Sequence, residues 1–184
     1  MIIESIVTTM DRKGSVNFAP MGVEWREQEI VIKPYKETTT YPNLKATGVA
    51  VVNLTDNVLL LARGAISSPQ FPWQPAERIA GAVLEDVCSW REVEVFEVDD
   101  REPRARFTVR VVHHGFRREF LGFNRARHAA LEAAILATRT KFLPLDHILS
   151  EFERLQVIVD KTAGPVEREA MALLTDFVRT AAAS

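Results

Sequence analysis

The chain has 184 residues, of which 47% are hydrophobic and 26% are charged. This composition is typical of a globular protein, and at this length about 70% of the unfolded surface can be buried without disulfides. The 23 basic and 25 acidic residues leave a net charge of −2, which provides no overall attraction for nucleic acid. No apolar run approaches the roughly 20 residues that span a bilayer, which argues against a membrane-spanning helix.

The cysteine content and the first residues indicate the compartment. The single cysteine, Cys88, excludes an internal disulfide and fits a reducing environment. The alternating apolar segment that follows it favours a small buried side chain over a nucleophile. The first ten residues contain Glu4 and no basic residue, so they do not resemble a signal peptide. We therefore expect a cytoplasmic protein that does not act at a membrane.

Short apolar or alternating segments, separated by turns, fill the first 125 residues. In 105–111 apolar residues alternate with polar ones, which predicts a half-buried strand. The continuous, β-branched run within 47–54 is typical of a buried strand. Further strands are expected at 2–9, 16–24, 29–33, 90–98 and 118–123. Three prolines in 67–78 exclude a central strand or a helix interior, so this segment is expected to be an ordered loop.

From residue 124 the apolar period becomes helical. It predicts helices at 126–140, 145–159 and 166–182, the last two separated by Gly164 and Pro165. Short strands at roughly ten-residue spacing favour an antiparallel barrel, and strands followed by helices define the α+β class. We predict two domains, a barrel domain at 1–125 and a helical C-terminal subdomain at 126–184.

One polar segment of the barrel has the chemistry of a phosphate site. If the chain is extended after residue 33, Lys36, Thr38 and Thr40 point to the same face. Residues two apart in a strand are separated by roughly 6.6 Å, so two hydroxyls and an ammonium group could hold one phosphate. The alternative interpretation is a threonine-rich exposed strand edge, because threonine is a good strand former.

A second segment, 17–22, could bind a planar ring. Pro20 and Gly22 are expected to make its backbone irregular and to leave amide groups without strand partners. Such amides can bond the polar edge of a heterocycle, and the small Ala19 would let the ring approach closely. The alternative interpretation is an ordinary bulge or kink in a strand.

Together, the two segments resemble the flavin site of the FMN-binding split-barrel superfamily, in its flavin reductase branch. There, an Asn-x-x-Pro strand lines the isoalloxazine ring and is followed by a basic residue, alternating Ser/Thr and a strand ending in Val-Asn. Over almost its full length the chain is also similar to the DUF447 family, most distinctively in 123–139 and 160–170. The resemblance implies a split β-barrel, bound FMN, and a homodimer with FMN at its interface.

The predicted cofactor-binding residues follow from these matches. They are Asn17, Ala19, Pro20, Met21, Gly22, Lys36, Thr38, Thr39, Thr40, Asn43, Asn53 and Arg125. Arg125 is included because a positive group near flavin N1 would stabilise the reduced ring. The neighbouring Asn124 is interpreted as the N-cap of the helix that follows.

Other polar residues are expected to be structural. His113 and His114 are adjacent in a predicted strand and would point to opposite faces, so no metal site is expected. The arginines between 101 and 118 are accompanied by acidic residues, which predicts a charge-compensated surface.

Three functions remain open from the sequence. The first is an FMN-dependent oxidoreductase of unknown substrate, because no catalytic triad or Cys-His pair is evident and the flavin would carry out the electron chemistry. The second is a flavin-binding carrier or sensor without turnover. The third is a nucleic-acid-binding barrel that contacts phosphates through Lys36 and the arginines.

Overall fold

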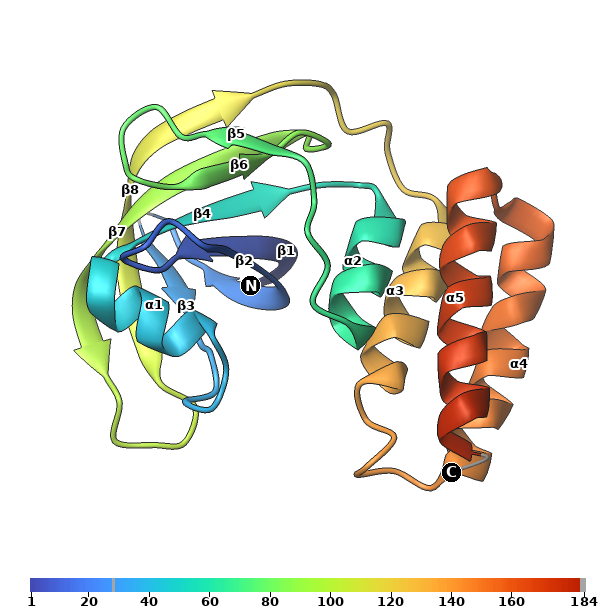
Figure 1. Ribbon diagram of the computed structural model, residues 1–184. Helices are drawn as coiled ribbons and strands as arrows, with labels where there is room; N and C mark the ends of the chain where they lie inside the picture. Colours follow the sequence, from blue (N-terminus) through green and yellow to red (C-terminus); the bar gives the residue numbers. More distant parts are fainter. Residues whose placement is uncertain (28, 183–184) are drawn as a thin grey trace. The chain divides into compact units, whose positions relative to one another are not determined.

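The computed structural model describes residues 1–27 and 29–182 (Figure 1). Residues 1–55 and 70–119 form one compact unit, which contains the strands. Residues 56–69 and the chain from 120 onward form a second, helical unit. The α+β class is therefore confirmed. In this division residues 56–69 belong with the C-terminal helices, whereas the boundary predicted from the sequence lies after residue 125.

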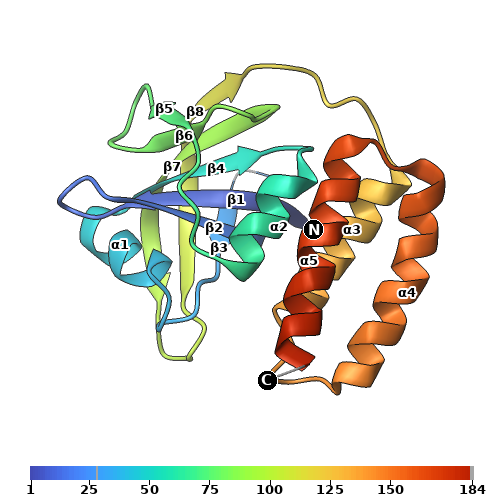
Figure 2. The same cartoon turned by 45° about the vertical axis from the view of Figure 1, so that its right-hand side comes forward.

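A closed antiparallel barrel forms the first unit (Figure 2). Its strands follow the order β1-β2-β3-β8-β7-β4 around the barrel. Their bounds are β1 Ile2–Met10, β2 Val16–Trp25, β3 Glu29–Ile32, β4 Val49–Leu54, β7 Ser89–Asp99 and β8 Arg106–Phe116. Because side chains alternate between the two faces of a strand, every second residue enters the barrel. The resulting core includes Val7, Val23, Ile30, Val52, Val93 and Phe107.

The segment after β8 differs from the prediction. Residues 118–123 do not form a strand, and β8 instead pairs with β3 and β7. Gly115 lies within β8 opposite Trp90 of β7. A Cβ atom on Gly115 would lie 1.9 Å from Cε2 of Trp90, so the indole ring occupies the space of the missing side chain.

Helix α1 (Thr40–Thr47) lies between β3 and β4 and packs at one end of the barrel. Its Leu44 joins the barrel core, and Tyr41 contacts Phe107 edge-on. Pro42 falls in the first turn, where its missing N–H has no intrahelical acceptor to lose. Gly48 ends the helix with φ of 69°. The extended chain predicted through Thr38 and Thr40 is therefore wrong, because the helix signals that follow, Pro42 and Gly48, outweigh the strand preference of threonine.

The proline-rich segment covers the outer face of β1 and β4. Its residues Trp73–Pro75 form β5, which pairs in a two-stranded sheet with β6 (Ala82–Leu84), the next strand along the chain. The Thr8 hydroxyl donates to the carbonyl of Ala82. Phe71 is buried and contacts Phe18 edge-on at 5.4 Å between ring centres. The three prolines lie outside the barrel strands as expected, but 67–78 is not all loop, because 73–75 form β5.

Glu92 of β7 holds this segment on the barrel through hydrogen bonds to residues 77 and 78. Its buried carboxylate accepts hydrogen bonds from the backbone amides of Glu77 and Arg78, at 2.8 and 2.7 Å, and from the Trp90 indole at 3.3 Å. Burial by itself raises the pKa of Glu92, but these hydrogen bonds favour the carboxylate more, and the net pKa lies below its usual value.

Replacing Glu92 with glutamine is expected to destabilise the barrel by about 1–3 kcal/mol at pH 7, because one amide of the 77–78 turn loses a charged acceptor. A pKa lowered by folding contributes stability above the unfolded pKa, and that contribution disappears as the pH falls through the folded pKa. In urea titrations from pH 7 to pH 3, the difference between wild type and Glu92→Gln should therefore shrink towards the acid end. A difference that is independent of pH would contradict this role.

The helical unit contains α2 (Val58–Ile66), α3 (Arg125–Ala137), α4 (Leu145–Thr162) and α5 (Pro165–Ala182). The three C-terminal helices match the prediction within a few residues. Helix α2 was not predicted, although Asn57 gives it an N-cap by accepting from Leu59 at 3.0 Å. Six buried alanines line α3 and allow its neighbours to pack closely. Among the described residues, no helix is long and apolar enough to cross a membrane.

Candidate functional site

The predicted ring-binding segment lies on β2, where the backbone is regular and not kinked as expected. Residues 16–24 pair with β1 in one continuous register. Met1 and Trp25 exchange both backbone hydrogen bonds, at 2.7 and 3.1 Å. Because such pairs alternate along an antiparallel ladder, the backbone groups of Phe18, Pro20 and Gly22 turn away from β1. Pro20 is tolerated since its nitrogen faces the side without a β1 partner.

The outer side of β2 is an open edge. Its pairing with β3 covers only Glu24 and Trp25. The outward-turned groups of Phe18, Pro20 and Gly22, which we call the open β2 edge, therefore have no strand partner within residues 1–27 and 29–182. Two amide donors and three carbonyl acceptors alternate along this edge. The ring of Phe71 lies beside it through its contact with Phe18 and provides an apolar neighbour.

The predicted phosphate segment forms the turn that enters α1. Thr38 and Thr39 are exposed, and Thr38 donates its hydroxyl to the carbonyl of Tyr35 at 2.7 Å. The Thr39 side chain makes no capping bond to α1. In the described part of the chain, the backbone amides of Thr39 and Thr40 have no acceptor. Two hydroxyls and two amides at the positive end of a helix dipole suit an anion.

Thr40 has a different environment from its two neighbours. It is 1% exposed, and its hydroxyl oxygen accepts from the Asn17 amide at 3.1 Å. Asn17 and Asn43 both direct their amide nitrogens at the hydroxyl oxygen of Thr9, at 3.5 and 3.2 Å. These four residues form a polar cluster that joins β1, β2 and α1. The Thr40 side chain therefore belongs to the packing of α1, and the row of Lys36, Thr38 and Thr40 on one face does not exist.

The cluster explains how the two candidate segments come together. Asn17 is the second residue of the β2 strand that carries the open edge, and Thr40 begins α1. Their hydrogen bond places the start of β2 beside the first turn of α1. Thr9 holds the centre of the cluster and was missed from the sequence, because an ordinary threonine in a strand gives no signal of its own. Lys36 lies exposed in the preceding turn, with its backbone amide bonded to Pro103.

Asn53 is buried inside unit one and is used structurally. Its amide nitrogen donates to the carbonyl of Ile6 at 3.0 Å, and its oxygen accepts from the Leu84 amide at 3.0 Å. The first bond joins β4 to β1, and the second joins β4 to the outer strand β6. With 0% exposure, its side chain holds the covering segment on the barrel.

Arg125 lies in the helical unit, where it is exposed as the first residue of α3. The N-cap expected at Asn124 is confirmed, since its side-chain oxygen accepts from the Arg127 amide at 3.0 Å. The Arg127 guanidinium binds Asp56 and Glu167, both at 3.0 Å, and so joins α3 to the starts of α2 and α5. The assignment of Arg125 to the flavin site stays a prediction.

The arginine-rich strands carry their own counter-charges. Arg101, Arg106 and Arg110 pair with Asp99, Glu24 and Glu94, respectively. These pairs neutralise the face that a nucleic acid would need. The predicted burial of Cys88 is confirmed.

Comparison with solved structures places this barrel in a known fold. An FMN-bound protein of Methanosarcina mazei has 21% identity and a TM-score of 0.83, with 96% of this chain and 94% of that chain covered. An FMN-binding protein from Thermus thermophilus with bound p-hydroxybenzaldehyde has 17% identity and a TM-score of 0.51, covering 61% and 70%. Nitrilotriacetate monooxygenase component B from Bacillus cereus has 17% identity and a TM-score of 0.54, covering 65% and 71%. The fold is thus a split β-barrel of the kind found in FMN-binding proteins.

Family profiles narrow the assignment. The N-terminal domain of the protein family of unknown function DUF447 matches residues 3–118, and its C-terminal domain matches residues 124–176. The chain therefore belongs to the DUF447 family, as the resemblance in its sequence implied. No curated protein matches the chain in sequence.

Proposed function

We propose that this chain is an FMN-binding flavoprotein, with the isoalloxazine ring on the open β2 edge and the phosphate at the start of α1. The observation that carries the proposal is the position of unpaired donors. The amides of Thr39 and Thr40 have no acceptor in the described residues, and the Asn17–Thr40 bond places them near the start of the strand that bears the open edge. The FMN-bound family member from Methanosarcina mazei supports this ligand.

The residues at the two segments fit the chemistry of FMN. A phosphate dianion suits the exposed hydroxyls of Thr38 and Thr39, the two helix-start amides and the charge of Lys36. The flavin ring has both donors and acceptors along one edge, which the alternating groups of Phe18, Pro20 and Gly22 can match. Ala19 and Met21 lie between these residues on β2, with their backbones paired to β1.

Bound FMN supplies electron transfer in one-electron and two-electron steps. The chain's own contribution is to hold the phosphate, to place the ring edge against fixed backbone groups, and to keep water from the Phe18 and Phe71 side. Arg125 would add a positive charge that favours the reduced, anionic ring. On this basis the protein is an oxidoreductase of unknown substrate that acts in the cytoplasm, where its single thiol stays reduced.

A homodimer with FMN at its interface is part of the proposal. Large apolar residues are exposed between β8 and α3, namely Phe120, Leu121 and Phe123. Leu121 is 80% exposed, and contiguous exposed apolar side chains usually mark an interaction surface. Sedimentation of the FMN-loaded protein should give twice the chain mass, and a monomer at micromolar concentration would contradict this part.

Purified protein reconstituted with FMN should be yellow and should retain about one flavin per chain after gel filtration. Stopped-flow mixing with NADH, NADPH and a reduced deazaflavin then tests turnover, since an oxidoreductase bleaches the flavin with at least one donor. Retained flavin that none of the donors reduces would favour a carrier or sensor. A protein that binds no flavin would overturn the proposed function altogether.

A further inference from the structure

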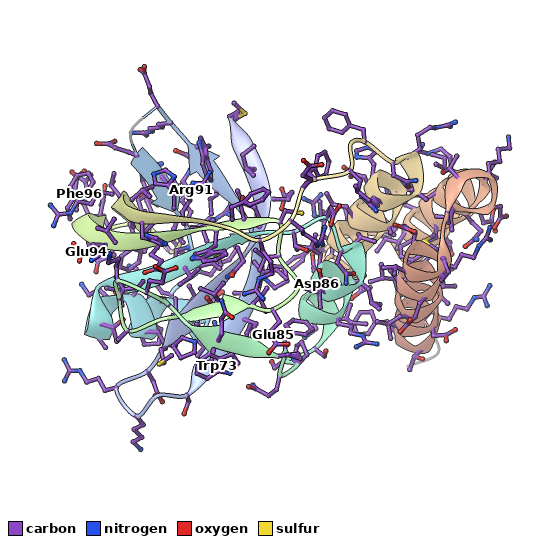
Figure 3. All side chains as sticks on the ribbon, turned by 90° about the horizontal axis from the view of Figure 1, so that it is seen from above. Trp73, Glu85, Asp86, Arg91, Glu94 and Phe96 are labelled. Carbon is purple, nitrogen blue, oxygen red and sulfur yellow. The ribbon has the colours of Figure 1, made fainter. Side chains whose placement is uncertain are left out.

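One charged side chain of the barrel has no place in the flavin site. Arg91 lies on β7 directly opposite Val52 of β4, and Val52 belongs to the barrel core. Because directly paired residues point to the same face of a sheet, Arg91 points into the barrel. Its guanidinium carbon is 5.6 Å from the centre of the Trp25 ring on β2 (Figure 3 labels Arg91).

This contact crosses the barrel interior. Two strands separate β2 from β7 in either direction around the barrel, so the two strands lie opposite each other. Trp25 ends β2, whereas α1 bonds to Asn17 at its start. Arg91 therefore spans the barrel at the end opposite α1, far along the strand from the phosphate segment.

The guanidinium is only partly satisfied there. Its Nη1 donates to the carbonyl of Trp90 at 2.8 Å, but its Nε is buried and has no acceptor. Among the described residues, no carboxylate forms an ion pair with it, and burial lowers the pKa of Arg91. An arginine nevertheless stays protonated in a protein, so the buried Nε–H of this half-buried, charged group is left without an acceptor.

The surroundings indicate which ligand would satisfy it. A guanidinium presents Nε and Nη2 as a planar fork that matches the two oxygens of a carboxylate. Val52 and Leu54 of β4 share the inward face with Arg91, and the Trp25 ring lies on its other side. Apart from His114, which is paired with Arg91 from β8, these neighbours are apolar, and they suit a hydrocarbon body better than a hydrated inorganic ion.

We propose that Arg91 binds the carboxylate of a small molecule with an apolar body, at the end of the barrel opposite α1. Because Nε is closed to solvent in this structure, binding shifts the guanidinium over the Trp25 ring. The fluorescence of Trp25 should therefore report the ligand. The proposal does not rest on FMN binding, since it uses none of the residues assigned to the flavin.

The test is a titration of the FMN-loaded chain with cyclohexanecarboxylate at constant ionic strength, followed by the melting temperature and by tryptophan fluorescence. Acetate, sulfate and the uncharged cyclohexanol provide the comparison ligands. We expect a saturable rise in melting temperature with cyclohexanecarboxylate, with acetate weaker and sulfate and cyclohexanol without saturable effect. Trp25→Phe should abolish the fluorescence response while leaving the thermal response in place.

Two variants assign the response to Arg91. Arg91→Met keeps much of the apolar stem and should weaken binding at least about tenfold, because the charged donor is lost. Arg91→Lys keeps the charge without the fork and should give intermediate binding, which preserves the test if the methionine variant does not fold. The matched control is Arg117→Met, since Arg117 lies 5.9 Å from the Trp90 ring but is exposed. That control should bind like wild type.

Two results would overturn the proposal. One is the absence of a saturable response in the wild-type chain. The other is an unchanged affinity in both Arg91 variants. Equal responses to sulfate and cyclohexanecarboxylate would overturn the assignment of an apolar body. If the chain does not retain FMN, the same titration is run without it, so failure of the flavin proposal and failure of this one are separate results.

Discussion

Replacing Gly115 with alanine is expected to destabilise the barrel by about 3 kcal/mol or more, the upper range for overpacking a core. The new Cβ would lie 1.9 Å from Cε2 and 2.0 Å from Cζ2 of Trp90, well inside contact distance. The indole cannot move aside easily, because it is 6% exposed and its Nε1 bonds Glu92. Chemical denaturation of both proteins measures the difference in the free energy of unfolding.

Two further variants separate this clash from other effects of losing a glycine. Gly14→Ala introduces a Cβ at φ of 87° with no atom within 4 Å, so it should cost only about 1 kcal/mol of backbone strain. In a Trp90→Phe background the smaller ring leaves more room, and the cost of Gly115→Ala should fall. Equal costs at Gly14 and Gly115, or the same Gly115 cost in both backgrounds, would show that Trp90 does not occupy this space.

Replacing Thr38 and Thr39 together with valine is expected to weaken FMN binding about 100-fold or more, while riboflavin binding changes little. Each hydroxyl bond to a charged group contributes about 1.5–3 kcal/mol, and riboflavin has no phosphate to lose. Thr38 donates to the Tyr35 carbonyl in this structure, and rotation of its side chain would redirect that hydrogen to a phosphate oxygen. Flavin fluorescence quenching gives both dissociation constants.

The control is Thr40→Val, which removes the third hydroxyl of the same run. Because Thr40 is buried and accepts from Asn17, its loss should lower the melting temperature and affect FMN and riboflavin alike. If Thr38→Val/Thr39→Val weakens both flavins equally, the phosphate does not bind at the start of α1. If Thr40→Val selectively weakens FMN, the buried polar cluster contacts the phosphate and its assignment to packing is wrong.

Much of the architecture was predictable because it depends on local periodicity. Alternation predicted β7 and β8, and helical spacing predicted α3, α4 and α5 within a few residues. The candidate site was predictable only as a set of segments. The run of threonines favours a strand by composition, and the signals for α1 were Pro42 in its first turn and Gly48 directly after its end. Helix α2 escaped notice because its apolar run is short and its partners are distant in sequence.

The sequence by itself determined which residues can bond a phosphate or bury an apolar side chain, since these properties belong to single residues and to their spacing. Only the tertiary structure decided which of them face solvent and which face one another. Thr38, Thr39 and Thr40 are chemically identical, yet only Thr40 is buried, because it packs in a polar cluster with Asn17 of β2 and Thr9 of β1. Strand register likewise placed Trp90 over Gly115 and Arg91 beside Trp25, and pairing between distant segments leaves no local mark in a sequence.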